Sequence, residues 1–396
     1  MDLKAVLLAL LLAVTNALDL PNLSTNPFEV YKIEAANITA KFIPYGARLT
    51  SLLVPDRNGN EQDVVLGYDK PEQYVTDTET DHTYFGAVVG RYANRITKGT
   101  FKIHDVDYTV SINQPDGDYT LHGGKVGYDQ RNWTVSDHTP SSVTFALYDD
   151  AFEGFPGKVV TFATYTVSTS AEGLPQLTTK LVSLSLTHKT PIMLTNHIYW
   201  NLDAFLAPTV DDLWLQLPLS RRFIGVGGKE LPTGRLVDAA TSFDGAVDFL
   251  EGKLIGKDIN KTEGLCGDNC VGYDTCMIID RPDAKCSDAL LPVLRMRSKR
   301  TGIKMEVLSD QPAVQIYTCN GAGPFPVKPS QIKRNRRHGE HKGVEVVNSH
   351  GCIAIEPQGW VDGINHDEWE QRSKQIFGPM DGPAVNLAVY KFSVVS

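Results

Sequence analysis

The sequence lacks the features that would place the protein in a membrane or on nucleic acid. Beyond an N-terminal apolar segment, no apolar run approaches the length of a membrane-spanning helix. Basic residues are in the minority, because 38 Lys and Arg stand against 47 Asp and Glu and give a formal net charge of −9. Binding to a phosphate backbone requires a basic face. We therefore expect neither a membrane nor nucleic acid as the main partner.

Helical patterns are also scarce, since few segments keep a helical period over three turns. Short runs in which apolar and polar residues alternate dominate instead, for example "SSVTFALYD" and "KVVTFATYTVS". The Asn-Gly pair in "DRNGNE" (Asp56 to Glu61) predicts a hairpin turn. The composition does not shift along the chain, and no long linker or fixed-period repeat is present. We therefore predict one all-β domain over residues 18–396, a large antiparallel β-sandwich with a short helix or two such as "HDEWEQRSK" (His366 to Lys374).

The N-terminal segment has the pattern of a signal peptide. Lys4 precedes an apolar run from Ala5 to Val14, which is too short to span a bilayer, and Ala17 is small enough to end a cleavage site. Four N-glycosylation acceptors agree with secretion. These acceptors are Asn22, Asn37, Asn132 and Asn260. We therefore expect residues 1–17 to be removed and the mature protein to be extracellular.

All six cysteines lie in the last third of the chain. They are Cys266, Cys270, Cys276, Cys286, Cys319 and Cys352. An even count in an oxidising compartment indicates disulfides, and the spacings lack the paired pattern of a zinc site. The one basic run, "KRNRRHGEHK" (Lys333 to Lys342), is most simply a solvated loop, with an anion or partner site as the alternative.

Four polar stretches carry candidate chemistry. They are "GRYANRITKGTF" (Gly90 to Phe101), "YTLHGGKVGYDQRNW" (Tyr119 to Trp133), "MLTNHIYWNLD" (Met193 to Asp203) and "IAIEPQGWVDGINH" (Ile353 to His366). Each has a purely structural alternative: a His before two glycines can mark a turn, a His in a strand can be a buried hydrogen-bonding group, and a Glu that ends an apolar strand can be salt-bridged. Taken singly, each stretch is weak.

Taken together, six segments in order resemble the aldose 1-epimerase (galactose mutarotase) family. They stand here as Ala93-Asn94-Arg95-Ile96, Leu121-His122-Gly123-Gly124, Thr195 to Leu202, Gly272-Tyr273-Asp274, Gln315 to Asn320, and Glu356-Pro357-Gln358. Cys319 occupies a position where the family usually has glycine, and the basic stretch from Gly321 to Gly343 differs from the usual loop. The resemblance implies the galactose mutarotase-like supersandwich. It also implies that the chain interconverts the α and β anomers of a free aldohexose such as glucose or galactose.

The resemblance also assigns roles to residues. Glu356 is the expected base for the C1 hydroxyl and His197 the expected acid for the ring oxygen, while Gln315 would orient Glu356. The expected sugar-binding residues are Asn94, Arg95, His122, Asp274 and Gln315. Trp200 or Trp360 is expected either to stack on the sugar or simply to pack in the core. Ring opening changes no oxidation state, so no cofactor or metal is expected; the preferred aldose and the oligomeric state stay open.

Three other functions fit parts of the pattern. A glycoside hydrolase would use Glu356 and Asp274 as its two acids. A sugar-binding protein on the same fold would have no need to keep Glu356 with His197. An epimerase of hexose 6-phosphates would need a basic pocket, for which Arg91 and the run from Lys333 to Arg337 are the candidates.

Strand register predicts one disulfide. If Gln315 lies opposite Glu356 in an antiparallel pair, the same register places Cys319 opposite Cys352, close enough for a bridge. The other four cysteines would pair most simply as Cys266–Cys270 and Cys276–Cys286.

Overall fold

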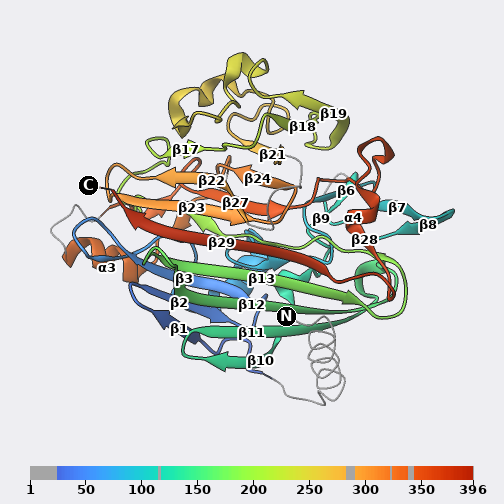
Figure 1. Cartoon of the computed structure of the whole chain (residues 1–396), viewed down its shortest axis with the longest axis horizontal. Coiled ribbons are helices and arrows are strands. Elements are labelled where there is room, and N and C mark those ends of the chain that lie inside the picture. The colour runs from blue at the N-terminus through green and yellow to red at the C-terminus, as the bar shows by residue number, and fades with distance from the viewer. Residues whose placement is uncertain (1–24, 115–116, 282–289, 322, 338–342, 396) are drawn as a thin grey trace.

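The computed structural model of the chain (Figure 1) describes residues 25–114, 117–281, 290–321, 323–337 and 343–395. Three antiparallel sheets dominate it. The four-stranded sheet has the order β1 (Tyr31–Ala35), β2 (Ile38–Ile43), β3 (Arg48–Pro55), β4 (Glu61–Asp63). The nine-stranded sheet has the order β10 (Thr134–Thr139), β11 (Ser142–Asp150), β12 (Lys158–Thr169), β13 (Pro175–Ser185), β29 (Ala384–Val394), β23 (Ile303–Ser309), β22 (Leu291–Arg297), β17 (Trp214–Gln216), β20 (Lys253–Leu254). The six-stranded sheet has the order β16 (Tyr199–Trp200), β27 (Ile353–Gln358), β24 (Ala313–Tyr317), β21 (Asp274–Ile278), β18 (Arg222–Val226), β19 (Pro232–Asp238). The predicted all-β antiparallel architecture is confirmed.

Smaller elements complete the fold. The two-stranded pairs are β14 (Thr190–Pro191) with β28 (Ile376–Phe377), β15 (Thr195–Asn196) with β5 (Val88–Val89), β25 (Phe325–Pro326) with β26 (Val346–Val347), β6 (Arg95–Thr97) with β9 (Tyr119–Leu121), and β7 (Thr100–Ile103) with β8 (Val106–Thr109). The α-helices are α2 (Gln73–Thr80), α3 (Pro329–Arg337) and α4 (Arg372–Gln375). The 3-10 helices are Tyr128–Gln130, Phe152–Gly154, Phe243–Gly245, Ile255–Lys257, Ile259–Lys261 and Asp367–Trp369. The helix expected over His366 to Lys374 is therefore two short pieces, and none of the helices in the described part of the chain is both long and apolar enough to cross a bilayer.

Alternating sequence patterns explain the long strands. Strand β13 buries every second residue from Pro175 to Ser185, as expected for a strand with one face in the core. The hairpin predicted at Asp56 to Glu61 joins β3 and β4. Asp56 Oδ1 accepts hydrogen bonds from the backbone N–H groups of Asn58 and Asn60, which closes this turn.

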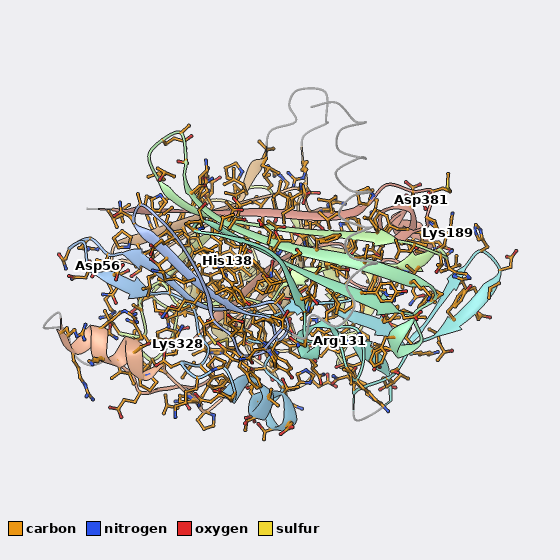
Figure 2. The ribbon with its side chains drawn as sticks, turned by 90° about the horizontal axis from the view of Figure 1, so that it is seen from below. Asp56, Arg131, His138, Lys189, Lys328 and Asp381 are labelled. Atoms are coloured by element: carbon orange, nitrogen blue, oxygen red, sulfur yellow. A yellow bond between two sulfur atoms is a disulfide. The ribbon has the colours of Figure 1, made fainter. Side chains whose placement is uncertain are left out.

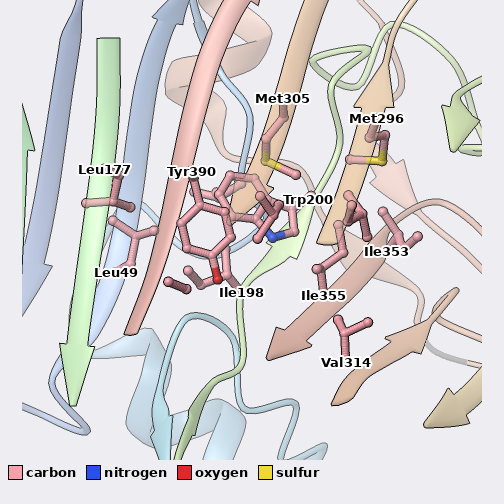
Figure 3. Close-up of a cluster of buried hydrophobic side chains, with 14 of the residues drawn as sticks. Leu49, Leu177, Ile198, Trp200, Met296, Met305, Val314, Ile353, Ile355 and Tyr390 are labelled. Carbon is pink, nitrogen blue, oxygen red and sulfur yellow. The ribbon is translucent and has the colours of Figure 1, made fainter. Parts of the chain in front are cut away.

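The main core takes side chains from all three large sheets, and Figure 3 shows part of it, including Leu49 of the four-stranded sheet. Ile353 and Ile355 of β27 and Val314 of β24 contribute from the six-stranded sheet, and Met305 of β23 and Tyr390 of β29 contribute from the nine-stranded sheet; all five are fully buried. Each such side chain stabilises the fold by roughly 1.5–3 kcal/mol through burial. Because side chains alternate along a strand, the residues between these apolar ones face the opposite side of the six-stranded sheet.

The basic run is not the solvated loop that the sequence suggested. Lys333 to Arg337 form the end of helix α3, and residues 338–342 lie outside the described part. The helix is held by buried polar groups: Lys328, labelled beside α3 in Figure 2, donates to Thr50 O at 2.9 Å and pairs with Asp63 Oδ2 at 2.7 Å. Gln331 accepts from the Asp63 N–H at 2.9 Å. This buried face is polar, so hydrophobic periodicity could not reveal the helix.

Two of the three predicted disulfides are present. Gln315 lies opposite Glu356 in the β24–β27 pair, and a Cys319–Cys352 bridge follows from the same register, as predicted. The Cys266–Cys270 bridge is also present. The predicted Cys276–Cys286 bridge is wrong: Cys276 is a free thiol buried in β21, and Cys286 lies outside the described residues, as do residues 1–17 and Asn22.

Candidate active site

A pocket of about 430 Å³ opens on the face of the six-stranded sheet that points away from the main core. Strands β27, β24 and β21 present alternate residues to it, while Ile355, Val314 and Met277 of the same strands point into the core. All seven residues predicted from the sequence line this pocket. They are Asn94, Arg95, His122, His197, Asp274, Gln315 and Glu356.

Glu356 and His197 form the pair on which the chemistry depends. Glu356 is 2% exposed and His197 5% exposed, and His197 Nε2 lies 3.5 Å from Glu356 Oε1. Within the described part of the chain, Glu356 Oε2 has no hydrogen-bond partner. Burial, helped by the nearby Asp274 carboxylate, raises the pKa of Glu356 well above its usual value, against the opposing effect of Arg95. Burial likewise lowers the pKa of His197 to about 3. Glu356 therefore lines the pocket and keeps one oxygen, Oε2, without a protein hydrogen-bond partner among the described residues.

The backbone of the neighbouring segment fixes His197. The His197 N–H donates to Ala87 O at 2.8 Å, and the Gly86 N–H donates to His197 O at 2.8 Å. A side chain at Gly86 would place its Cβ 2.0 Å from Leu49 O, so this close approach requires glycine. His197 thus sits on a rigid connection between β15 and β16.

His122 and Asn94 face each other where the β6–β9 pair ends. Both have left-handed backbones, with φ of 49° and 60°, a conformation that costs an L-residue about 1 kcal/mol or more. The His122 N–H donates to Asn94 O at 2.9 Å, and the Asn94 N–H donates to His122 Nδ1 at 3.1 Å. Nδ1 is therefore an acceptor, so the proton of the neutral ring is on Nε2. Burial and the nearby His197 lower the pKa of His122, which keeps the ring neutral. A side chain at Gly123 would place its Cβ 2.0 Å from Gly90 O, so the backbone after His122 requires glycine.

Gln315 does not orient Glu356 as the sequence suggested. Its amide donates a hydrogen bond to Asp274 Oδ1, although its backbone lies opposite Glu356. Asp274 also lies 3.7 Å from Arg95 Nη2, and Arg95 donates to Asn94 Oδ1 at 3.0 Å. Burial raises the pKa of Asp274, while Arg95 and the Gln315 amide oppose the rise. Gln315 therefore positions Asp274, the expected ligand of a ring hydroxyl.

Neither tryptophan forms an aromatic wall of the pocket. Trp200 is fully buried in the main core, 5.0 Å from the Tyr390 ring, and Trp360 lies 5.7 Å from the Trp369 ring beside a different cleft. Aromatic residues that line the pocket are Tyr84, Tyr119, Tyr199, Tyr317 and Phe325. The His197 ring stacks on Tyr199 at 4.8 Å and on Tyr84 at 5.7 Å. Strand alternation was the missed signal, because Tyr199 is two residues from His197 and shares its face, whereas Trp200 does not.

The second cleft, of about 530 Å³, contains none of the seven predicted residues. It is lined in part by Trp360, Arg281 and Lys374. Although it is larger, it lacks a carboxylate–imidazole pair among its described residues, and the chemistry belongs to the pocket with Glu356.

Comparison with known proteins agrees with this geometry. A family model described as aldose 1-epimerase matches residues 29–375. The chain belongs to the aldose 1-epimerase family. A probable aldose 1-epimerase of Arthroderma benhamiae is 51% identical over 385 residues, which cover 93% of this chain and 87% of that protein. A galactose mutarotase of Bos taurus is 29% identical over 357 residues, which cover 90% of this chain and 92% of that protein.

A solved structure shares the aldose 1-epimerase fold with this chain. The GalM/aldose epimerase homologue from C. elegans matches with a TM-score of 0.77 and 28% identity, covering 93% of this chain and all of that one. The galactose mutarotase-like supersandwich expected from the sequence is thereby confirmed.

Proposed function

We propose that this protein is a mutarotase that interconverts the α and β anomers of free aldohexoses such as glucose or galactose. The observation that carries the proposal is the pair of Glu356 and His197, 3.5 Å apart at the pocket and surrounded by groups able to bind hydroxyls. Family membership and similarity to galactose mutarotases support it.

Glu356 and His197 each exchange one proton with the sugar when the ring opens and again when it closes. Glu356 takes the proton of the C1 hydroxyl while His197 gives a proton to the ring oxygen, and the C1–O5 bond breaks. The C1–C2 bond rotates, His197 takes back the proton of the C5 hydroxyl, and Glu356 returns its proton as the ring closes on the other face of the carbonyl. Ring opening therefore leaves His197 with one proton fewer and Glu356 with one proton more. Burial of both groups favours a neutral imidazole and a protonated carboxyl before the sugar reacts, so the step begins once the Glu356 proton has passed to His197 across the 3.5 Å between Oε1 and Nε2.

The surrounding groups hold the sugar during rotation. His122 Nε2–H donates to one hydroxyl, and Asp274, positioned by Gln315 and Arg95, accepts from others. The tyrosine rings beside His197 give the sugar an apolar wall.

The alternatives fit the geometry less well. Asp274 is tied to Arg95 and Gln315, which does not suit the second acid of a glycoside hydrolase. Arg91 is 1% exposed and bound to Asp149, and helix α3 does not line the pocket, so neither supplies a phosphate site for a hexose 6-phosphate. A protein that only binds sugar has no use for a carboxylate and an imidazole held together.

Polarimetry tests the proposal directly. Freshly dissolved α-D-glucose and α-D-galactose should reach their equilibrium rotation faster in proportion to added protein. A rate equal to that of buffer, for every aldose tried, would overturn the proposed activity.

We also propose that the protein is secreted after removal of residues 1–17. Two disulfides and three exposed acceptor residues, Asn37, Asn132 and Asn260, support this location. Expression in a eukaryotic host should give a glycosidase-sensitive protein in the medium that begins at Leu18. Retention in the cell with Met1 intact would contradict it.

A further inference from the structure

Glu230 reaches the pocket from a separate hairpin. It lies in the turn between β18 and β19, and its carboxylate accepts a hydrogen bond from Arg95 Nη2 on β6. No sequence pattern marked this contact, because the two residues are 135 positions apart. Glu230 lines the same pocket as Glu356 and His197.

The turn holds this carboxylate in place. Glu230 has a left-handed backbone with φ of 59°, its N–H donates to Gly227 O at 2.8 Å, and the Gly227 N–H donates to Leu231 O at 2.9 Å. The Asp268 N–H, within the loop closed by the Cys266–Cys270 disulfide, donates to Gly228 O at 2.9 Å. The backbone that carries Glu230 is therefore held by the turn, and the carboxylate itself is held by Arg95.

Acidic side chains outnumber basic ones in the pocket. Among the described residues that line it, Arg95 is the one Lys or Arg side chain. Four carboxylates line the same pocket: Asp81, Glu230, Asp274 and Glu356. Arg95 is paired with Glu230, and its Nη2 also lies 3.7 Å from Asp274 Oδ2. The positive charge of Arg95 is thus already matched by two acids.

We propose that Glu230 is a specificity-determining residue that neutralises Arg95 and so makes the pocket select uncharged aldoses over sugar acids such as hexuronates. This inference rests on the proposed mutarotase function and names its substrate class. A guanidinium without an acidic partner is a ready binding site for a carboxylate. With Glu230 in place, the excess negative charge of the pocket repels an anionic sugar. A neutral sugar is not repelled, so its binding is not weakened.

The test compares two substrates and two variants. For wild-type protein, Glu230→Gln and Asp118→Asn, kcat/KM is measured on α-D-galactose and on α-D-galacturonate. Asp118 is the matched control, because its carboxylate pairs with Lys229 of the same turn but does not line the pocket.

Glu230→Gln should raise the ratio of kcat/KM for galacturonate to kcat/KM for galactose by roughly tenfold. This is the effect of one unit charge acting across several ångströms of a partly desolvated site. Asp118→Asn should change the ratio by less than about twofold. An unchanged ratio in Glu230→Gln, or the same rise in both variants, would overturn the proposal.

Wild-type protein supplies a second measurement that needs no variant to fold. Raising the salt from low to high concentration should improve galacturonate turnover and leave galactose turnover unchanged, because salt screens the repulsion. Equal turnover of the two sugars at low salt would contradict the inference.

Failure of the proposed function gives a different result. If no aldose is anomerised, NMR titration with galactose and galacturonate still compares their binding. Preferential binding of galactose that Glu230→Gln abolishes would keep the specificity inference and reject the mutarotase, whereas equal binding by wild-type protein would reject the inference too.

Discussion

His197 Nε2 lies 3.5 Å from Glu356 Oε1, and of the two residues Glu356 alone belongs to a strand of the six-stranded sheet. Glu356 is on β27, and His197 lies in the short connection between β15 and β16, the strand that pairs with β27. The sheet therefore brings together a carboxylate and an imidazole that are 159 positions apart in sequence. Because both are buried, each is a poor site for a charge, and the neutral imidazole with a protonated carboxyl is favoured over the ion pair.

Replacing Glu356 with Gln should lower the mutarotation rate by at least about 10²-fold, the usual scale for removing a positioned acid–base group. The amide keeps the shape of the side chain but cannot take the C1 proton. Polarimetry at saturating galactose gives the rate, and Glu306→Gln on β23, outside the pocket lining, is the control. A variant at near wild-type rate would remove Glu356 from its role as base.

The same Glu356→Gln variant should be more stable than the wild type at alkaline pH. Burial raises the pKa of Glu356 above its unfolded value, so its stabilising contribution is complete below the unfolded pKa and is lost as pH rises through the folded pKa. Gln stays neutral at every pH and avoids this loss. Melting temperatures from pH 4 to pH 9 should therefore diverge in favour of the variant as pH rises. Parallel curves would mean that Glu356 has an ordinary pKa.

The two histidines should affect different kinetic constants. His197→Ala removes the proton donor and should lower kcat by at least about 10²-fold, while His122→Ala removes a hydroxyl ligand and should mainly raise KM. The His122 ring is held by Asn94 rather than by Glu356, which supports this division. Steady-state kinetics on both variants decide the matter, and equal losses of kcat would show that the roles are assigned wrongly.

Backbone relationships were the most predictable part of the site. The motifs placed all seven residues in one pocket, and the assumed pairing of Gln315 with Glu356, which the structure contains, placed Cys319 opposite Cys352. In an antiparallel pair without a bulge, one known pair fixes every other pair along the two strands.

Side-chain partners were harder to predict, because register does not set a rotamer. The Gln315 amide turns to Asp274 on the other neighbouring strand, although its backbone faces Glu356. Glu230 could not be linked to Arg95, since that contact depends on how a distant hairpin folds over the pocket. Helix α3 escaped prediction because Gln331 and Asn335, four residues apart, bury amides rather than apolar groups.

The Cys319–Cys352 bridge should contribute more to stability than the Cys266–Cys270 bridge. Both Cys319 and Cys352 are fully buried, and their bridge spans 33 positions against 4 for the other. On the loop-entropy model the longer loop is worth about 3.5–4 kcal/mol and the shorter one about 2 kcal/mol. The double variant Cys319→Ala/Cys352→Ala should therefore lose more free energy of unfolding than Cys266→Ala/Cys270→Ala, measured by urea denaturation of protein made in an oxidising compartment.

Cys276 is the internal control, because it is a free thiol, and Cys276→Ala should show only the modest cost of a small buried cavity. Equal losses from the two double variants would show that loop length does not govern the contribution of these bridges. Non-reducing peptide mapping of the wild type accompanies the measurement, and a Cys319 peptide linked to anything but Cys352 would contradict the register of β24 and β27 as well.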